Sequence, residues 1–302
     1  MVKKISTMKK RTDSGDRKFY ITVYVLLTVF FLLTLYPLVY VVSASISTPE
    51  AAAAGRIWLY PVGFSLEGYK MVFNNAKVGW GFYNSVIYTI FGTLINLSVT
   101  LLTAFVLSRR ELAGRTVLTF MFVFTMWFSG GIIPLYLQVM NLGMLNTRWS
   151  LWLPIALSVW NMIIARTFMA TSIPEELFEA ASMEGCGYFR YFIRIVLPLS
   201  GPIIAVLALF YGIDHWNAYF RPLIYITNQK LMPLQIVLRD ILVANDISVE
   251  DLMSSATAEA NFGRVELLKY ALIIVSCLPL WIAYPFIQKS FVKGVMIGAI
   301  KG

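Results

Sequence analysis

Charged residues are scarce in this sequence of 302 residues. Only 14% of the residues are charged and 58% are hydrophobic, whereas a soluble domain of this size has about a quarter of its residues charged. The net charge of +9 does not indicate a nucleic-acid-binding protein, because the basic residues flank apolar runs and form no single dense patch. Lysine and arginine at the ends of apolar runs are typical of a membrane protein.

Histidine and cysteine are nearly absent. A single histidine, His215, excludes the usual multi-histidine metal sites. Cys186 lies in a segment expected in the cytoplasm and Cys277 in an apolar run, so neither a disulfide nor a metal site is expected.

The sequence also lacks the Gly-x-x-x-x-Gly-Lys-Ser/Thr motif that holds nucleotide phosphates in many ATPases. If ATP drives this protein, we expect ATP and magnesium to bind partner subunits. We therefore expect a non-catalytic chain that binds no cofactor and no metal of its own.

Six apolar runs predict an all-α membrane protein, because a membrane helix needs about 20 residues. The predicted spans are Phe19–Ile46, Val78–Ser108, Thr116–Thr147, Trp149–Ala165 with the apolar residues beyond Arg166, Ile195–Phe220 with Asp214 inside it, and Tyr270–Gln288. In the third run, Gly130, Gly131 and Pro134 predict a kink or a discontinuity.

The distribution of lysine and arginine predicts that both termini lie in the cytoplasm. Residues 1–18, 108–116, 165–200 and 288–302 hold 16 of the 25 basic residues. The apolar run after the basic stretch is too long for a cleavable signal peptide. We expect residues 1–18 to form a cytoplasmic tail and residues 19–302 a single transmembrane domain, with large outer loops at about 44–80 and 226–266.

The segment between the fourth and fifth predicted spans is the most informative part of the chain. Ser172–Glu175 predicts a helix start, with Ser172 as the cap of a capping box. A short helix should then run through Leu177–Ala181, and Gly185 and Gly187 should end it.

A second short helix is expected at residues 188–196. Helical spacing predicts that Tyr188, Phe192 and Ile195 share one face and that Arg190 and Arg194 share another. From these residues alone, the structural interpretation of the segment is an amphipathic hairpin lying at the membrane interface.

Within this segment, Glu179-Ala180-Ala181 is followed after three residues by Gly185, and after nine more by Ile195-Val196-Leu197-Pro198. This pattern resembles the EAA loop of binding-protein-dependent ABC importer permeases. The resemblance implies a short cytoplasmic coupling helix, in a loop at about 170–200, that docks into a groove of an ATP-binding subunit. The residues implied in coupling are Glu179, Ala180, Ala181, Gly185, Ile195, Leu197 and Pro198.

The chemistry of these residues suits that role. The glutamate can pair with a basic residue of the partner, the small alanine pair permits close approach, and glycine permits the turn. Many family members have aspartate before this glycine. This chain has Glu184 there, which keeps the charge.

Short motifs elsewhere resemble the carbohydrate-uptake branch of this family. They are Tyr36-Pro37-Leu38, Asn84-Ser85, Trp216-Asn217, and the tail motifs at 288–294 and 298–302. Within that branch the chain is similar to permeases for complex oligosaccharides or polysaccharide fragments. The resemblance implies an ATP-driven sugar importer in the bacterial cytoplasmic membrane, with a second related permease, two ATP-binding subunits and an extracytoplasmic sugar-binding protein.

Asp214 is a charged residue near the middle of the fifth predicted span, about 16 Å along the helix from Ile203. A charge at this depth costs roughly 2.5–3.5 kcal/mol, so it should face protein or water. Helical spacing places Tyr211, Asp214, Asn217 and Arg221 on one polar stripe, whereas His215 points away from Asp214.

Two interpretations of the stripe stay open. It lines a sugar pathway, in which Arg221 would suit an acidic sugar, or it makes a structural contact such as an Asp214–Arg221 network. Trp216 belongs to the candidate pathway through the family motif. The main alternative function is an ion-coupled secondary transporter that uses Asp214, although no inverted repeat supports it. A membrane enzyme would need a cluster of acids or histidines, which the sequence does not offer.

Overall fold

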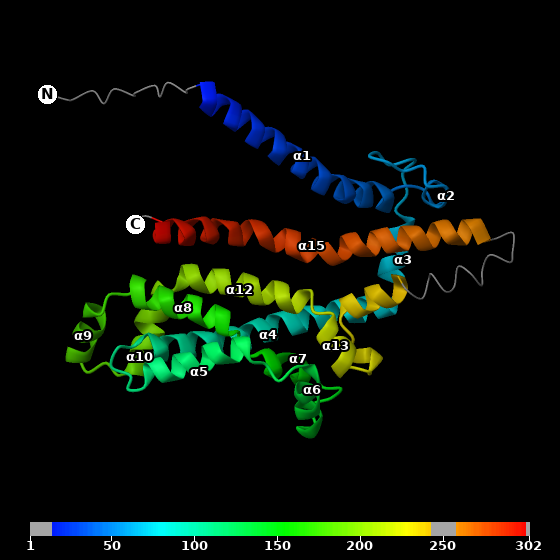
Figure 1. The fold of residues 1–302 in the computed structure, drawn as a ribbon. Helices are drawn as coiled ribbons and strands as arrows, with labels where there is room; N and C mark the ends of the chain where they lie inside the picture. The colour runs from blue at the N-terminus through cyan, green and yellow to red at the C-terminus, as the bar shows by residue number, and fades with distance from the viewer. Residues whose placement is uncertain (1–13, 243–257, 300–302) are drawn as a thin grey trace. The chain divides into compact units, whose positions relative to one another are not determined.

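The computed structural model describes the backbone of residues 14–242 and 258–299, and the side chains of residues 16–242 and 263–285. Within these segments every regular element is a helix (Figure 1), which confirms the predicted all-α class. Contacts divide the chain into two compact units, residues 1–70 with 251–274 and residues 71–250 with 275–302.

The first unit contains α1 (Ser14–Ser45), α2 (Pro49–Ala53), the start of α3 (Glu67–Asn74) and the first part of α15 (Ala258–Ala299). The ring of Tyr40 on α1 lies 5.8 Å from the ring of Tyr270 on α15. A Cβ atom on Gly68 would lie only 2.8 Å from the carbonyl oxygen of Leu267, so glycine permits the close crossing of α3 and α15. The segment 44–80, predicted as an outer loop, is therefore partly helical.

Helix α1 exposes its apolar side chains almost completely. None of the residues in its most apolar 18-residue window is buried. An apolar helix without burial in its own chain needs lipid or another protein around it.

The second unit is built around α4 (Ala76–Ser108), which packs against α8 (Val159–Ser172) and α12 (Gly201–Trp216). Around this core lie α5 (Arg115–Trp127), α6 (Ile132–Asn141), α7 (Trp149–Trp152), η1 (Leu153–Ile155) and α13 (Phe220–Tyr225). At the end of the bundle where α4 stops and α12 starts lie α9 (Glu176–Met183), α10 (Tyr188–Tyr191), η2 (Phe192–Val196) and α11 (Leu197–Leu199) (Figure 1).

The short helix η3 (Gln229–Leu231) lies near the N-terminal end of α4. The amide nitrogen of Asn84 donates to the carbonyl oxygens of Lys230 and Met232, at 2.8 and 3.2 Å. The hydroxyl of Tyr88 donates to the carbonyl oxygen of Leu231 at 2.7 Å. Side chains of α4 therefore donate hydrogen bonds to backbone carbonyl oxygens in and next to η3.

Sharp bends interrupt three of the predicted spans. Helices α5 and α6 turn by 111° at a break that includes Gly131, whose φ is +84°. The predicted discontinuity is thus present, and it is larger than a kink. The stretches 149–155 and 159–172 meet at 53°, and the stretches 188–199 and 201–216 meet at 82°.

Among the described residues, three helices are long and apolar enough to cross a membrane alone, and the bent pairs raise that number to as many as six. The fifth run differs from its prediction, because its helix stops at Trp216 and does not continue through Phe220. The tail motifs at 288–294 and 298–302 lie outside the described side chains.

Candidate functional site: a helical hairpin and a pocket at Asp214

The hairpin starts differently from its prediction. Ser172 is the last residue of α8, and α9 follows Glu175 without a side-chain cap. The predicted capping box is therefore wrong, because the preceding helix extends to Ser172 and keeps that residue in helical geometry. The first turn of α9 begins with backbone hydrogen bonds, from Phe178 N and Glu179 N to Glu175 O at 2.9 and 3.1 Å.

The end of α9 agrees with its prediction. The amide of Cys186 donates to Ala181 O and the amide of Gly185 donates to Ser182 O, both at 2.9 Å. This pair of bonds is a Schellman motif. It requires the left-handed conformation of Gly185, whose φ is +76° and which glycine adopts without strain.

The EAA residues of α9 lie on two different faces of the helix. Phe178 and Ala181 are buried in the hydrophobic core of the second unit, whereas Glu179 and Ala180 are exposed. Met183, on the exposed side, has a relative exposure of 89%. The alanine pair therefore does not act as one surface, because Ala180 faces outward and Ala181 packs inward.

The second half of the hairpin buries a different set of residues from the predicted one. Tyr191, Phe192 and Val196 are buried, whereas Tyr188 is exposed. The predicted face assumed α-helical spacing, but residues 192–196 form a π-helix, which adds a residue to the turn. Of the remaining EAA residues, Ile195 and Leu197 are half-buried against the core, and Pro198 is exposed.

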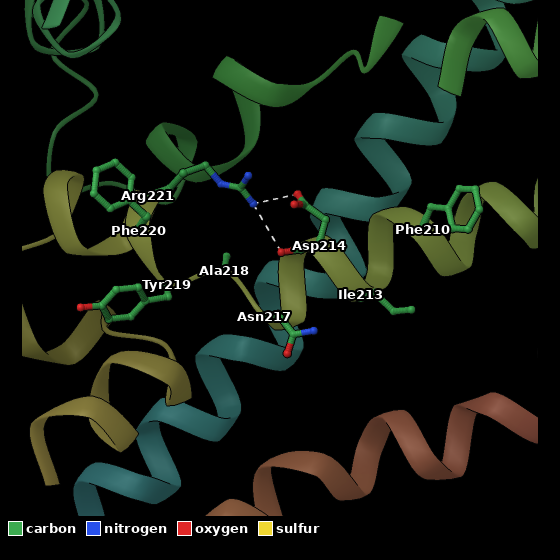
Figure 2. Close-up of a pocket in the computed structure, with 8 residues that line it drawn as sticks. All are labelled: Phe210, Ile213, Asp214, Asn217, Ala218, Tyr219, Phe220 and Arg221. Atoms are coloured by element: carbon green, nitrogen blue, oxygen red, sulfur yellow. Dashed lines mark hydrogen bonds and ion pairs between the residues drawn. The ribbon is translucent and has the colours of Figure 1, made fainter. Parts of the chain in front are cut away.

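A cavity of about 560 Å³ lies at the end of α12 and the segment after it (Figure 2). Figure 2 shows the side chain of Arg221 reaching back from α13 toward Asp214. Arg221 Nη2 lies 2.8 Å from Asp214 Oδ2 and 3.4 Å from the carbonyl oxygen of Asp214. The lining residues are Phe210, Ile213, Asp214, Asn217, Ala218, Tyr219, Phe220 and Arg221.

The predicted polar stripe on one helix is wrong, because α12 ends at Trp216 and Arg221 belongs to α13. The chain turns at residues 217–219 and still brings Arg221 to Asp214. Asn217 lines the same cavity. The structure thus contains the Asp214–Arg221 ion pair, and both members of the pair line the cavity.

Tyr211 and Trp216 are buried, unlike Asp214. The hydroxyls of Tyr211 and Thr100 lie 2.6 Å apart, and Tyr211 lines a second cavity of about 350 Å³ together with Asp214 and Arg221. Trp216 donates from Nε1 to the carbonyl oxygen of Ser276 at 2.9 Å and lines neither cavity. Tyr211 therefore lies beside the site, whereas Trp216 has a packing role.

His215 points away from Asp214, as predicted. It is buried, and its Nε2 lies 2.6 Å from Asn96 Oδ1. The amide nitrogen of Asn96 in turn contacts the carbonyl oxygen of Ile155. The imidazole lies against Gly92, where a Cβ atom would collide with the ring.

The sequence reasoning missed the polar face of α4 that meets these residues. Every fourth residue on this face is polar or glycine: Asn84, Tyr88, Gly92, Asn96 and Thr100. That period of four inside an apolar helix was the signal available in the sequence, since residues four apart share a helix face.

No protein-family model matches the chain. The chain is 37% identical over 287 residues to the polygalacturonan/rhamnogalacturonan transport system permease protein YtcP of Bacillus subtilis (strain 168), covering 95% of this chain and 99% of that protein. It is 38% identical to protein LplC of the same strain, covering 89% of this chain and 90% of that protein.

A solved structure is also similar. It is a chain of a bacterial ABC transporter involved in the import of the acidic polysaccharide alginate, with 32% identity and a TM-score of 0.83. The likeness covers 92% of this chain and 98% of that chain.

Proposed function

The chain belongs to the carbohydrate-uptake permeases of binding-protein-dependent ABC importers, and on that premise we propose that it is one of two membrane subunits through which an oligosaccharide enters the cytoplasm. ATP binding and hydrolysis, with magnesium, occur on partner subunits. The observation that carries the proposal is the likeness to the alginate importer chain over nearly the whole length of both proteins.

In this proposal the chain crosses the bacterial cytoplasmic membrane six times, with both termini in the cytoplasm. Residues 1–18 are the cytoplasmic tail and residues 19–302 form one permease domain. Helices α1, α4 and α15 are single spans. The pair α5 and α6 makes the third span, residues 149–155 with α8 make the fourth, and residues 195–216, beyond the hairpin, make the fifth. The excess of lysine and arginine in the cytoplasmic segments supports this orientation.

The hairpin α9–α10 is the proposed coupling element. Glu179 and Ala180 lie on the exposed face of α9, where Glu179 can pair with a basic residue of the ATP-binding subunit. The other EAA residues act indirectly, because they fix the shape of the hairpin. They are Ala181, Gly185, Ile195, Leu197 and Pro198. Closure of the ATP-binding subunits moves the hairpin and switches the pathway between inward-facing and outward-facing states.

In this proposal the cavity at Asp214 forms part of the sugar pathway. Asp214 and Asn217 can hydrogen-bond sugar hydroxyls, and the exposed ring of Tyr219 offers a stacking surface. Arg221 can bind a carboxylate, since the planar guanidinium matches carboxylate geometry. Arg221 therefore favours an oligosaccharide that contains uronic acids, and the similar transporter chain comes from an importer of the acidic polysaccharide alginate.

The proposed partners follow from this role. A second, related permease completes the membrane pathway, two ATP-binding subunits lie beneath it, and an extracytoplasmic sugar-binding protein delivers the substrate. Helix α1, with its exposed apolar surface, is available to lipid and to the second permease.

Purification of the tagged chain from its own membrane, followed by native mass spectrometry, tests this assembly. We expect a complex with a second permease and two ATP-binding subunits. A lone chain or a homodimer that is stable in mild detergent without an ATPase would contradict the proposal and favour ion-coupled transport.

The substrate class is tested separately, in vesicles that contain the complex and its binding protein. We expect ATP-dependent uptake of oligogalacturonate and weaker uptake of neutral oligosaccharides of the same length. Equal uptake of both would argue against a uronic-acid substrate and leave the importer assignment intact.

A further inference from the structure

The first residue after α4, Arg109, lies among aromatic rings from three helices. Its guanidinium carbon is 5.1 Å from the ring of Phe178 on α9, 5.7 Å from that of Phe105 on α4, and 5.8 Å from that of Tyr191 on α10. A single side chain at the end of α4 therefore contacts both helices of the hairpin.

Aromatic rings are the main surroundings of this guanidinium. Its Nε and Nη1 atoms are buried and have no hydrogen-bond partner among the described residues. Burial of unpaired donors is unfavourable, whereas a desolvated cation is attracted to the faces of aromatic rings. Any displacement of Phe178 or Tyr191 away from α4 would remove that attraction, so the hairpin and the end of α4 are held together.

The next two residues make further contacts with the same hairpin. Arg110 Nε lies 3.4 Å from Glu175 Oε2, just before α9. The hydroxyl of Tyr188 on α10 donates to Glu111 Oε2 at 2.6 Å. We call residues Arg109, Arg110 and Glu111 the clamp.

Helix α4 runs from the clamp toward the pocket at Asp214. Thr100 lies about 14 Å along the helix from Arg109 and bonds to Tyr211, and Asn96 contacts His215. Both Tyr211 and His215 belong to α12, which carries Asp214. The contacts from the hairpin through α4 to the pocket form one continuous network of the kind that can carry coupling between sites.

The covalent route from the hairpin to the pocket is less direct. The chain passes through the π-helix at 192–196 and then bends by 82° before α12. A π-helix is rare and frequently occurs at a functional site. One straight helix would transmit movement of the hairpin directly to α12. The bent chain does not provide such a direct connection.

We propose that the clamp makes α4 a coupling element, which moves with the hairpin and transmits that movement to the pocket at Asp214. Arg109 is its central positioning residue. This inference rests on the proposed function, because it requires an ATP-binding subunit that moves the hairpin.

The first test compares Arg109→Gln with Arg109→Lys in the whole complex. We expect Arg109→Gln to keep the ATP-binding subunits bound and to keep basal ATPase activity, but to lower substrate-stimulated ATPase activity and uptake at least about fivefold. Arg109→Lys, which keeps the cation, should restore part of the stimulation. Arg115→Gln, just beyond the clamp at the start of α5, is the control and should behave as wild type.

The outcomes separate the two proposals. If wild-type complex contains no ATPase subunit, the proposed function fails whatever Arg109 does. If wild-type complex couples transport to ATP and Arg109→Gln retains full stimulation, the clamp proposal is overturned. Loss of the ATPase subunits from Arg109→Gln complexes would also overturn it, because that result assigns Arg109 to assembly of the docking surface.

A second test does not depend on Arg109. In a chain with Cys186→Ala and Cys277→Ala, Arg110→Cys and Glu175→Cys are joined by a short bifunctional thiol reagent. We expect the cross-linked complex to retain at least about half of its uptake, because the clamp and hairpin move as one body. Abolition of uptake on cross-linking, reversed by a cleavable reagent, would show that they must separate and would overturn the proposal.

Discussion

The hairpin and the pocket differ in how completely their side chains are held. In the hairpin, Phe178, Tyr191 and Phe192 are buried in the core, whereas the outer faces of α9 and α10 are exposed. In the pocket, the side chain of Asp214 is 52% exposed and that of Arg221 is 25% exposed. The inner contacts of the hairpin are thus fixed, whereas the pocket has side chains that can change partners.

Energetics support this contrast. A half-exposed ion pair such as Asp214–Arg221 contributes little to stability, at most about 1 kcal/mol. A substrate hydroxyl or carboxylate can therefore compete for either member of the pair. The hairpin offers no such exchange, because its inner contacts are dehydrated and its turn depends on one backbone conformation.

The largest expected effect comes from breaking the fixed turn with Gly185→Val. The left-handed φ of +76° is unfavourable for a β-branched residue by about 1–3 kcal/mol, and relief of that strain would reorient α10. We expect uptake to fall more than about tenfold. The measurements are uptake and recovery of the ATP-binding subunits with the tagged chain.

Gly187→Val is the matched control for that turn. Gly187 has a φ of −73° and a ψ of 161°, which valine adopts readily. A Cβ atom at either glycine meets nothing within 4 Å, so the pair differs in backbone conformation alone. Equal effects of the two substitutions would contradict the role given to the Gly185 turn.

The second effect tests the open face of α9 with Glu179→Arg. Charge reversal would place two cations together if Glu179 pairs with a basic residue of the ATPase. We expect about a tenfold loss of bound ATP-binding subunits, with normal levels of the chain in the membrane. Glu50→Arg, on the exposed part of α2, is the charge-matched control; if both variants bind the ATPase normally, Glu179 makes no such contact.

A smaller effect is expected at the pocket, from Asp214→Asn. This change keeps the shape of the side chain and removes the charge that holds Arg221. We expect uptake to fall about threefold to tenfold while the ATP-binding subunits stay bound. Unchanged KM and maximal rate of uptake would mean that Asp214 has only a structural role.

The smallest effect is expected from Tyr188→Phe. The substitution removes the hydroxyl that binds Glu111 and leaves the aromatic ring stacked on Phe178, at 4.9 Å between centroids. We expect uptake to change by about twofold or less, because exposed hydrogen bonds contribute little. A loss as large as that of Gly185→Val would mean that the hydrogen bond, and not the buried rings, fixes the hairpin.

Local signals in the sequence were sufficient for much of the fold. The second predicted span, Val78–Ser108, agrees closely with α4, because its apolar run has clear ends. The turn at Gly185 was also predictable, since a helix that ends in a Schellman motif needs glycine at that position. Both features depend on residues that are neighbours in the chain.

Features that depend on distant residues were not predictable in the same way. Ser172 has the right spacing for a cap, but the extension of α8 decides its conformation. The proximity of Arg221 to Asp214 was expected from a continuous helix and arises instead from a turn after Trp216. The guanidinium of Arg109 meets rings from two later helices, and no periodicity near residue 109 indicates that contact.

The split between Ala180 and Ala181 has a consequence for how such subunits diverge. Residues on the outer face of α9 take no part in the burial that stabilises the hairpin, so mutations there are nearly neutral for folding. If the outer face of α9 docks the ATPase, as proposed, substitutions on that face can change the choice of ATPase after gene duplication without disturbing the buried Ala181 and Phe178. In that case the hairpin separates the evolution of partner choice from the evolution of the fold.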